Sequence, residues 1–377
     1  MIVGAARVVA PNTDFAPGHV AVEGEHISAV GPGIPSGADR VLPEGTLIPG
    51  FIDLQVNGAS GVDLLECDTA AVARLSDYLA STGVSGFLPT LVSAPAERLA
   101  GAVQVVRDAH PSGAAILGVH LEGPVLNPQR KGAHQTRWLR FPGDAEVRIM
   151  YAEALPDLRL VTLAPELPGV DGLMEWLVRE RVIVALGHTE ATYEQANHAF
   201  GAGARMVTHL FNAMRPFHHR DPGIVGAAFD DPRCTCGLIA DGVHVHPAGV
   251  RLAYRMLGAD RIALVSDAVA AAGMAPGTYT LGTRPVRVKA GDVPRLEDGT
   301  LAGSVLRLDQ AIGNLLSWGI PLRDAVTSSS HVPAAVLGLA DRGALAVGLR
   351  ADLTVLDRNH RAVLTLVGGR IVHERAA

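Results

Sequence analysis

The chain has 377 residues, enough for one large domain and a smaller one, and 48% of them are hydrophobic although only 4% are aromatic. Its formal net charge of −6, without a basic stripe, gives no support for nucleic-acid binding. No apolar run is long enough to cross a membrane, no secretory signal is recognisable, and three cysteines cannot all pair. We therefore expect a cytoplasmic protein without a membrane partner.

Both ends of the chain are typical of β-structure. Residues 1–48 consist of short apolar runs broken by glycine and proline, with a hairpin signal at Glu23-Gly24-Glu25. Residues 341–377 have the same character. Because chain ends often lie close together, we expect one small β-sandwich domain built from both ends.

The middle of the chain, residues 49–340, alternates between strand-like and helix-like patterns. Eight short apolar runs predict buried parallel strands, at 50–56, 86–91, 116–121, 160–164, 183–186, 206–209, 236–240 and 262–266. Helical patterns are found at 69–81, 95–109, 171–181, 190–200, 247–257, 307–318 and 322–337. This alternation predicts an α/β fold, a (β/α)₈ TIM-like barrel.

Two features refine the barrel prediction. A doubly wound sheet is the competing fold, but no G-x-G-x-x-G follows the first strand. Residues 274–304 interrupt the alternation with hairpin-like material. We interpret this segment as a β insertion after the eighth strand.

Ionisable side chains follow several of the predicted strands. Glu122 follows the third strand, His188 the fifth, His209 the sixth and Asp267 the eighth. The carboxyl ends of barrel strands meet on one face, where catalytic groups lie. One carboxylate and two imidazoles can hold Zn²⁺ or another divalent ion with one position open. Asp267 then remains as a carboxylate that can accept a proton from water.

Several assignments stay open at this point. Glu166 also follows a strand, the fourth, and competes as a metal ligand. His134 and His244 lie in predicted loops, where polar residues often serve function, but simple solvent exposure would also explain them. Asp267 could instead be a helix cap or a salt-bridge partner.

Nearly the whole chain resembles the amidohydrolase superfamily, and within it the deacetylases of N-acetylglucosamine 6-phosphate. The specific signal is the combination of LEGP with KGAH, THLFNAM and DGVHV, since GH or SDA alone would be weak. The matching segments are PGFIDLQVNG (49–58), LGVHLEGPVLNPQRKGAH (117–134), VTLAPE (161–166), GHTEAT (187–192), THLFNAM (208–214), RDPG (220–223), IADGVHV (239–245), LVSDA (264–268) and GTLAGS (299–304).

The resemblance implies a reaction and a set of roles. The chain would hydrolyse N-acetylglucosamine 6-phosphate to glucosamine 6-phosphate and acetate, in amino-sugar catabolism or recycling. One divalent metal ion per subunit, with zinc preferred and Fe²⁺, Co²⁺ or Mn²⁺ as alternatives, would activate water and would be bound by Glu122, His188 and His209. Asp267 would be the general base and acid, and His134 would polarise the acetyl carbonyl.

The resemblance also implies the substrate contacts. They would come from Ala133, Asn212, Ala213, Arg220, His244, Leu301, Ala302, Gly303 and Ser304. Arg220 would reach the sugar phosphate bound to a neighbouring subunit, which implies a homodimer. A guanidinium suits this task because its donors match two phosphate oxygens at once.

One departure from the wider superfamily bears on the metal count. Most amidohydrolases carry H-x-H after the first strand, whereas this chain has Gln55-Val56-Asn57. Amides are poor divalent-metal ligands beside imidazole, so we expect a mononuclear site. The alternatives are a cyclic-amide hydrolase, a deacetylase of a related N-acyl amino sugar, or a scaffold that has lost its site. The complete set of Glu122, His188, His209 and Asp267 argues against the scaffold.

Overall fold

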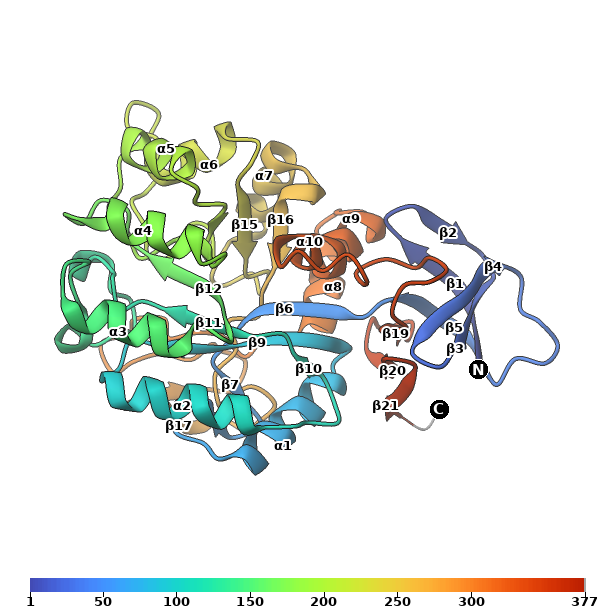
Figure 1. The fold of residues 1–377 in the computed structure, drawn as a ribbon. Helices are drawn as coiled ribbons and strands as arrows, with labels where there is room; N and C mark the ends of the chain where they lie inside the picture. The colour runs from blue at the N-terminus through green and yellow to red at the C-terminus, as the bar shows by residue number, and fades with distance from the viewer. Residues whose placement is uncertain (376–377) are drawn as a thin grey trace.

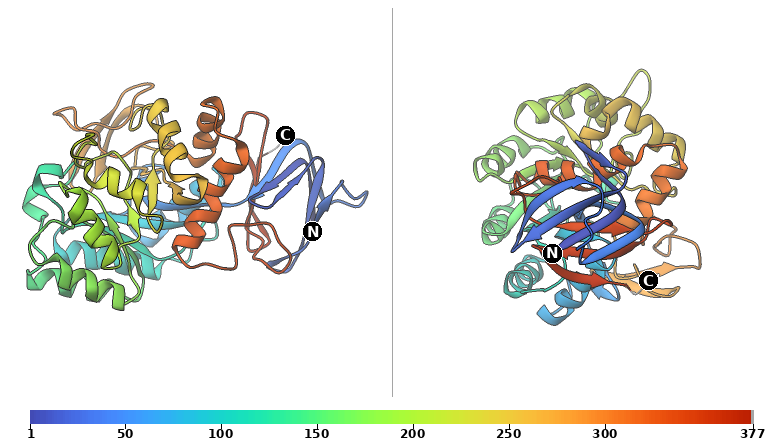
Figure 2. Two further views of the ribbon diagram at one scale, coloured as in Figure 1. Left: turned by 90° about the horizontal axis from the view of Figure 1, so that it is seen from above. Right: turned by 90° about the vertical axis from the view of Figure 1, so that its right-hand side faces the viewer.

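The computed structural model describes residues 1–375, and its two largest sheets lie end to end (Figure 1). A nine-stranded sheet, parallel throughout, forms the barrel in the middle of the chain. An eight-stranded mixed sheet gathers strands from both chain ends, so that the two termini lie on the same side of the molecule (Figure 2). The predicted fold class is thereby confirmed.

All eight predicted barrel strands are present, and the third is divided in two. The chain turns between the two parts at Gly118, whose φ of +127° favours glycine and whose Cβ would meet Arg159. The strands are β6 (Phe51–Val56), β9 (Val84–Val92), β10 (Ala115–Ile116), β11 (Val119–Glu122), β12 (Leu158–Leu163), β13 (Ile183–Leu186), β14 (Met206–Val207), β15 (Thr235–Leu238) and β16 (Ile262–Leu264).

Backbone contacts just after β16 close the barrel. The N–H of Asp267 donates to the carbonyl of Gln55 at 2.9 Å, and Val56 forms a parallel bridge with Ala268. The first and last strands are thus joined at their carboxyl ends. This closure brings Asp267 next to the residues that follow β6.

Helices surround the barrel. They are α1 (Thr69–Ala80), α2 (Ala96–Asp108), α3 (Ala145–Ala154), α4 (Val170–Arg179), α5 (Tyr193–Gly201), α6 (Gly223–Asp230), α7 (Pro247–Leu257), α8 (Leu308–Ser317), α9 (Leu322–Val326) and α10 (Val332–Val336). A π-helical turn at 327–331 joins α9 to α10, and short 3₁₀ helices occupy η1 (Pro128–Arg130), η2 (Thr136–Trp138) and η3 (Ala259–Arg261). Helix α5 begins three residues later than predicted because Thr192 and Gln195 form a capping box.

The strands from the two chain ends form one sheet. Its order is β21-β20-β19-β5-β1-β3-β4, with β2 paired to β1. The predicted hairpin at residues 23–25 joins β3 to β4 and is confirmed. The strands are β1 (Ile2–Ala10), β2 (Thr13–Phe15), β3 (Gly18–Glu23), β4 (His26–Pro32), β5 (Arg40–Pro49), β19 (Leu353–Leu356), β20 (Ala362–Val367) and β21 (Arg370–Glu374). Residues 376–377 of the predicted small domain lie outside the described residues.

The small sheet packs against the amino end of the barrel. The hydroxyls of Thr354 and Thr365 donate to the carbonyls of Gly83 and Ala80, just before β9, each at 2.8 Å. Strand β6 runs directly from this sheet into the barrel (Figure 1). The carboxyl ends of the barrel strands therefore point away from the small sheet and are free to form a site.

The predicted insertion is a hairpin on the carboxyl side of the barrel. Strands β17 (Gly277–Leu281) and β18 (Arg284–Val288) pair antiparallel. A small apolar cluster beneath them contains Leu281, Val286 and Ala302. Two shorter strands, β7 (Gly58–Ala59) and β8 (Val62–Asp63), pair nearby.

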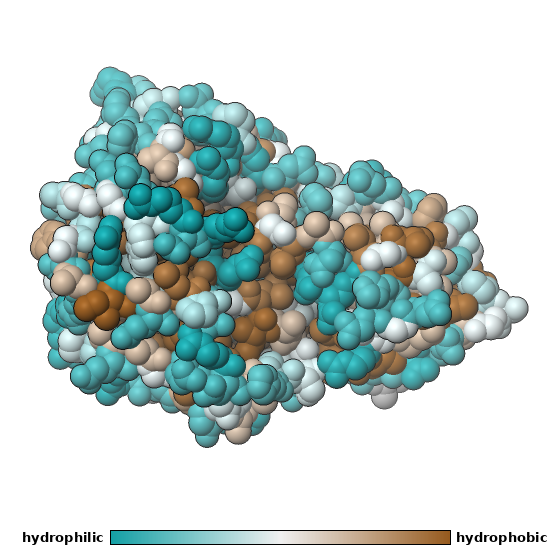
Figure 3. Space-filling view, in the orientation of Figure 1, coloured by the Kyte–Doolittle hydropathy of each residue, from teal (hydrophilic) through white to brown (hydrophobic). Residues whose placement is uncertain are grey.

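The visible face of the molecule in Figure 3 is mostly hydrophilic, with the larger apolar areas near its middle. Within residues 1–375, every helix is too short or too polar to cross a bilayer. The main hydrophobic core fills the barrel and the space beneath its helices, and a second one lies in the small sheet.

Candidate active site

Three predicted metal ligands form a tight triangle at the carboxyl ends of the barrel strands. The Oε1 atom of Glu122 lies 3.2 Å from Nε2 of His188 and 3.1 Å from Nε2 of His209. The two Nε2 atoms are 3.2 Å apart. Donor atoms at about 2.0–2.1 Å from a tetrahedral zinc ion would lie about 3.3–3.4 Å apart, so the triangle fits such an ion closely.

The protonation states of His188 and Glu122 also suit a cation. The Nδ1–H of His188 donates to the carbonyl of Arg130 at 2.8 Å, and burial lowers the pKa of His188 to about 4. Its Nε2 therefore presents a lone pair toward the Glu122 carboxylate. Burial raises the pKa of Glu122, but its contacts with the imidazoles of His134, His188 and His209 lower it well below its usual value. A neutral imidazole and an ionised carboxylate are the ligand forms that a metal requires.

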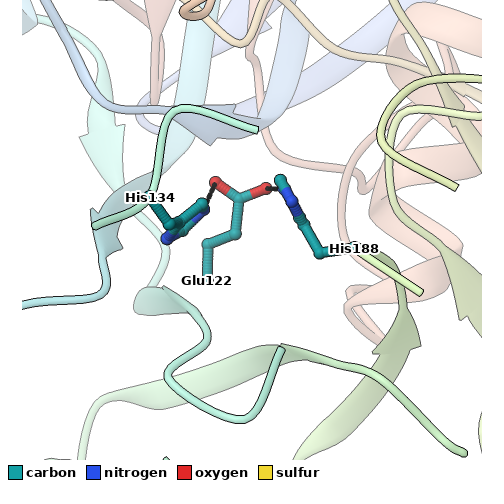
Figure 4. Close-up of side chains that lie close together, drawn as sticks. All are labelled: Glu122, His134 and His188. Atoms are coloured by element: carbon teal, nitrogen blue, oxygen red, sulfur yellow. Dashed lines mark hydrogen bonds and ion pairs between the residues drawn. The ribbon is translucent and has the colours of Figure 1, made fainter. Parts of the chain in front are cut away.

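His134 lies on the other side of the same carboxylate. Figure 4 shows Glu122 between His134 and His188, with one oxygen facing each ring. The ligand atoms of these three residues all lie within 4.8 Å of one another, but Nε2 of His134 is 3.6 Å from Oε2 of Glu122. This is looser than the contacts of His209. We therefore take His209 as the third corner of the triangle and His134 as its neighbour.

The hydrogen bonds of His134 define which nitrogen carries its proton. The backbone N–H of Ser93 donates to Nδ1 of His134 at 3.3 Å, and the Ser93 hydroxyl lies 2.9 Å from the same atom. Because Nδ1 accepts, the neutral ring has its proton on Nε2. His134 can thus donate a hydrogen bond into the site.

Asp267 is buried beside the triangle and is contacted by two amides. Nδ2 of Asn57 donates to its Oδ1 at 2.7 Å. Nε2 of Gln55 donates both to that oxygen, at 3.2 Å, and to Oε1 of Glu122, at 3.0 Å. Two neutral amides thus lie where most amidohydrolases would have the H-x-H histidines. Burial, followed by the charge of Glu122, raises the pKa of Asp267 to about 7.

Three residues of the site have a strained backbone. His188, His209 and Asp267 have φ values of +49°, +30° and +50°, a region that side chains other than glycine rarely adopt. Such strain persists only where neighbouring contacts impose it. For Asp267 these contacts are its own N–H to Gln55 and the N–H of Ser304 to its carbonyl at 2.8 Å.

A cavity of about 320 Å³ opens above these residues, within the usual size range of small-molecule sites. Six of the predicted substrate contacts line it, namely Ala133, Asn212, Ala213, His244, Leu301 and Gly303. Nδ1–H of His244 donates to Asp241 at 2.6 Å, which fixes the orientation of the ring.

The other three predicted contacts lie elsewhere. The side chain of Ala302 packs into the apolar cluster of the insertion. The hydroxyl of Ser304 donates to the carbonyl of Ser266 at 2.5 Å, beneath Asp267. Arg220 is exposed and lies 2.9 Å from Nε2 of the adjacent His219.

Glu166, the alternative ligand, does not reach the triangle. Its carboxylate accepts hydrogen bonds from Asn127, Thr189 and the N–H of Glu190. Because its oxygens are engaged by the surrounding loops, we do not assign Glu166 as a metal ligand.

Sequence reasoning missed part of the cavity. Its lining also includes Val92, Gln129, Arg130, Gly132, Ile239, Leu281 and Thr300. Gln129, Arg130 and Gly132 lie within the LNPQRKGAH run, so this motif was the available signal. Ile239 and Thr300 likewise lie in the IADGVHV and GTLAGS segments, whereas Val92 and Leu281 are apolar positions outside any motif.

Comparison with known proteins gives the family context. Residues 46–372 match the model of the amidohydrolase family. The chain is 39% identical over 335 residues to the N-acetylglucosamine-6-phosphate deacetylase of Vibrio furnissii, covering 88% of this chain and 84% of that protein. It is 34% identical over 381 residues to the Bacillus subtilis enzyme of the same name, covering 97% and 95%.

A solved structure agrees over almost the whole chain. It is a mutant of the N-acetyl-D-glucosamine-6-phosphate deacetylase of Mycobacterium smegmatis in complex with N-acetyl-D-glucosamine 6-phosphate. The TM-score is 0.93 at 36% identity, with 99% of each chain covered.

Proposed function

The chain belongs to the amidohydrolase family, as its motifs predicted, and we propose that it deacetylates N-acetylglucosamine 6-phosphate. The products are glucosamine 6-phosphate and acetate. The observation that carries this proposal is the Glu122, His188 and His209 triangle beside a buried Asp267, in a chain 34–39% identical to deacetylases of this substrate. We propose the cytoplasm as its location, supported by three cysteines that all remain free thiols.

The triangle supports one divalent ion per subunit, zinc before Fe²⁺, Co²⁺ or Mn²⁺. A bound ion would supply Lewis acidity, which lowers the pKa of water and polarises an amide carbonyl. Gln55 and Asn57 support a single ion, because their amide groups donate to Glu122 and Asp267 where a second ion would require ligands.

In the proposed reaction Asp267 transfers the proton. As a carboxylate it accepts a proton from the water whose oxygen attacks the acetamide carbon. It then gives this proton to the amine nitrogen as the carbon–nitrogen bond breaks. A pKa raised to about 7 makes it a stronger base than an ordinary aspartate and still a competent acid near neutral pH.

His134 supports the same step from the opposite side. Its Nε2–H points toward the Glu122 carboxylate. The negative charge of the tetrahedral intermediate develops on the acetamide oxygen. Donation from His134 to that oxygen stabilises this charge. Ser93 maintains the donor on Nε2 by occupying Nδ1.

We also propose that the enzyme is a homodimer in which Arg220 binds the phosphate of a substrate in the neighbouring subunit. Among the described residues Arg220 has no carboxylate within ion-pair distance, and its side chain extends into solvent. The exposed side chains of Phe217 and Val243, at 54% and 47%, offer apolar surface for a partner.

The test measures acetate released from N-acetylglucosamine 6-phosphate by protein stripped of metal and by the same protein reloaded with zinc. Unphosphorylated N-acetylglucosamine is the matched control substrate. We expect zinc-dependent release with strong preference for the phosphorylated sugar. Zinc binding without any acetate release would reject the deacetylase and favour hydrolysis of another amide.

A further inference from the structure

We infer that Glu166 is a positioning residue for the metal ligand His188, acting through the two loops that fix the backbone and ring of that histidine. The inference rests on the metal site proposed above. Glu166 follows β12 and does not reach the triangle. Its effect must therefore pass through neighbouring residues.

The first loop contacts the ring and the carbonyl of His188. The acceptor for Nδ1–H of His188 is the carbonyl of Arg130, within the η1 turn. This turn is closed by the side chain of Asn127, whose Oδ1 accepts from the N–H of Gln129 at 2.8 Å. The N–H of Asn127 donates to the carbonyl of His188 at 2.9 Å. One residue thus links the turn to His188 itself.

The second loop continues the chain from His188. Its first two residues are Thr189, which is buried, and Glu190, which forms an ion pair with Arg130. Because His188 has a φ of +49°, its backbone tends to relax toward the ordinary regions unless both loops prevent it. Any such relaxation would rotate Nε2 away from the triangle.

The Glu166 carboxylate joins the two loops. Its Oε1 accepts from Nδ2 of Asn127 at 2.8 Å and from the N–H of Glu190 at 2.6 Å. Its Oε2 accepts from the hydroxyl of Thr189. A single side chain therefore contacts the residue that closes the η1 turn and both residues that follow His188. Charge-assisted bonds of this kind are stronger than bonds between neutral groups.

The experiment compares zinc affinity in four variants, measured by competition with a chromophoric chelator after the metal has been removed. Glu166→Ala removes all three bonds, and we expect zinc to bind about 10–100-fold more weakly, the usual effect of losing a group that orients a metal ligand. Glu166→Gln keeps an acceptor oxygen and can donate to the Thr189 hydroxyl, so we expect it to recover most of the affinity. Asp171→Ala, an exposed carboxylate on α4, is the control and should match the wild type.

Thr189→Val provides a second test in case Glu166→Ala does not fold. It removes one bond to Glu166 without changing charge, and we expect an affinity between those of the wild type and Glu166→Ala. If Glu166→Ala binds zinc as tightly as the wild type, the inference is overturned, even if the variant is less stable. If Glu166→Ala does not fold, wild-type zinc affinity in Thr189→Val overturns it instead. A wild-type protein that binds no zinc would instead reject the metal site on which the proposed function depends.

Discussion

Two carboxylates lie in the same site but in opposite electrostatic surroundings. Glu122 is contacted by three imidazoles, and these contacts outweigh burial and lower its pKa. Asp267 is buried beside the Glu122 charge, and its pKa is raised to about 7. Environments that separate the pKa values of neighbouring acids commonly separate their roles. Glu122 therefore suits a permanently ionised ligand, and Asp267 suits a group that gains and loses a proton.

Replacement of Asp267 by asparagine tests this division of roles. Asparagine preserves the shape of the side chain but cannot accept the proton, so kcat should fall by about 10²–10⁴-fold. Zinc affinity should change little, because Asp267 is outside the triangle. Steady-state kinetics and chelator competition on the same preparation measure both quantities. A variant with nearly wild-type kcat would remove Asp267 from the mechanism.

At the level of single elements, the barrel was predictable because each strand is a short apolar run. Runs such as IVAL at 183–186 have one physical explanation in a chain of this length, burial between helices and neighbouring strands. The polar residues that follow several strands, such as Thr208 after β14, were predictable for the same reason, since they emerge at the carboxyl end.

The loops were less predictable, for identifiable reasons. Helix α6 (GIVGAAFD) is apolar on all sides, so no amphipathic period marks it. The contact of Ser93 with His134 joins residues 41 positions apart through a loop whose path depends on tertiary packing. The role of Glu166 depends on three partners from two other loops, which no spacing in the sequence indicates.

Gly187 tests how closely the strand ends must pack beneath the triangle. A Cβ at this position would lie 2.9 Å from both Cγ2 of Thr162 and Cβ of Thr208, neither of which can withdraw. We expect Gly187→Ala to destabilise the protein by about 1–3 kcal/mol and to weaken zinc binding by displacing His188. Gly172→Ala, at an exposed position of α4 where nothing lies within 4 Å, is the matched control and should be neutral or stabilising. Equal urea-unfolding midpoints for the two variants would contradict this packing argument.

At the scale of the whole molecule, hydrogen bonds and apolar contacts join the small sheet to the barrel at the amino end of the strands. We propose that residues 1–48 with 341–377 act as a structural domain that fixes this end, leaving 49–340 to carry the site. The hydroxyls of Thr354 and Thr365 already contact the segment before β9.

A buried acid in β6, Asp53, makes stability depend on pH. Burial raises the pKa of Asp53 to about 6, from 3.8 in an unfolded chain. The folded state therefore binds more protons between these values, so the contribution of Asp53 to stability falls as pH rises from about 4 to about 6 and stays low above pH 6.

Asp53→Asn retains an acceptor for the N–H groups of Gln55 and Ser266. It should stabilise the protein at pH 8 by up to about 3 kcal/mol, with little effect at pH 4. Urea unfolding at both pH values measures this, with the exposed Asp108→Asn as control; an equal gain at both values would contradict it.

The dimer proposal predicts complementation between two inactive proteins. Arg220→Ala and Asp267→Asn each damage every site of their own homodimer. After subunit exchange, a mixed dimer has one site with an intact Asp267 and the partner's intact arginine, so an equal mixture should reach about a quarter of the wild-type rate. Absence of recovery despite verified exchange would mean that Arg220 serves its own subunit or none.

The most direct test of the metal site is a crystal structure of the zinc-loaded protein with an anomalous difference map at the zinc edge. The geometry predicts one peak per subunit, about 2.0–2.2 Å from a Glu122 oxygen and from Nε2 of His188 and His209. A second peak beside Gln55 and Asn57, or a single ion bound by His134 in place of His209, would contradict the mononuclear site on which the proposed mechanism depends.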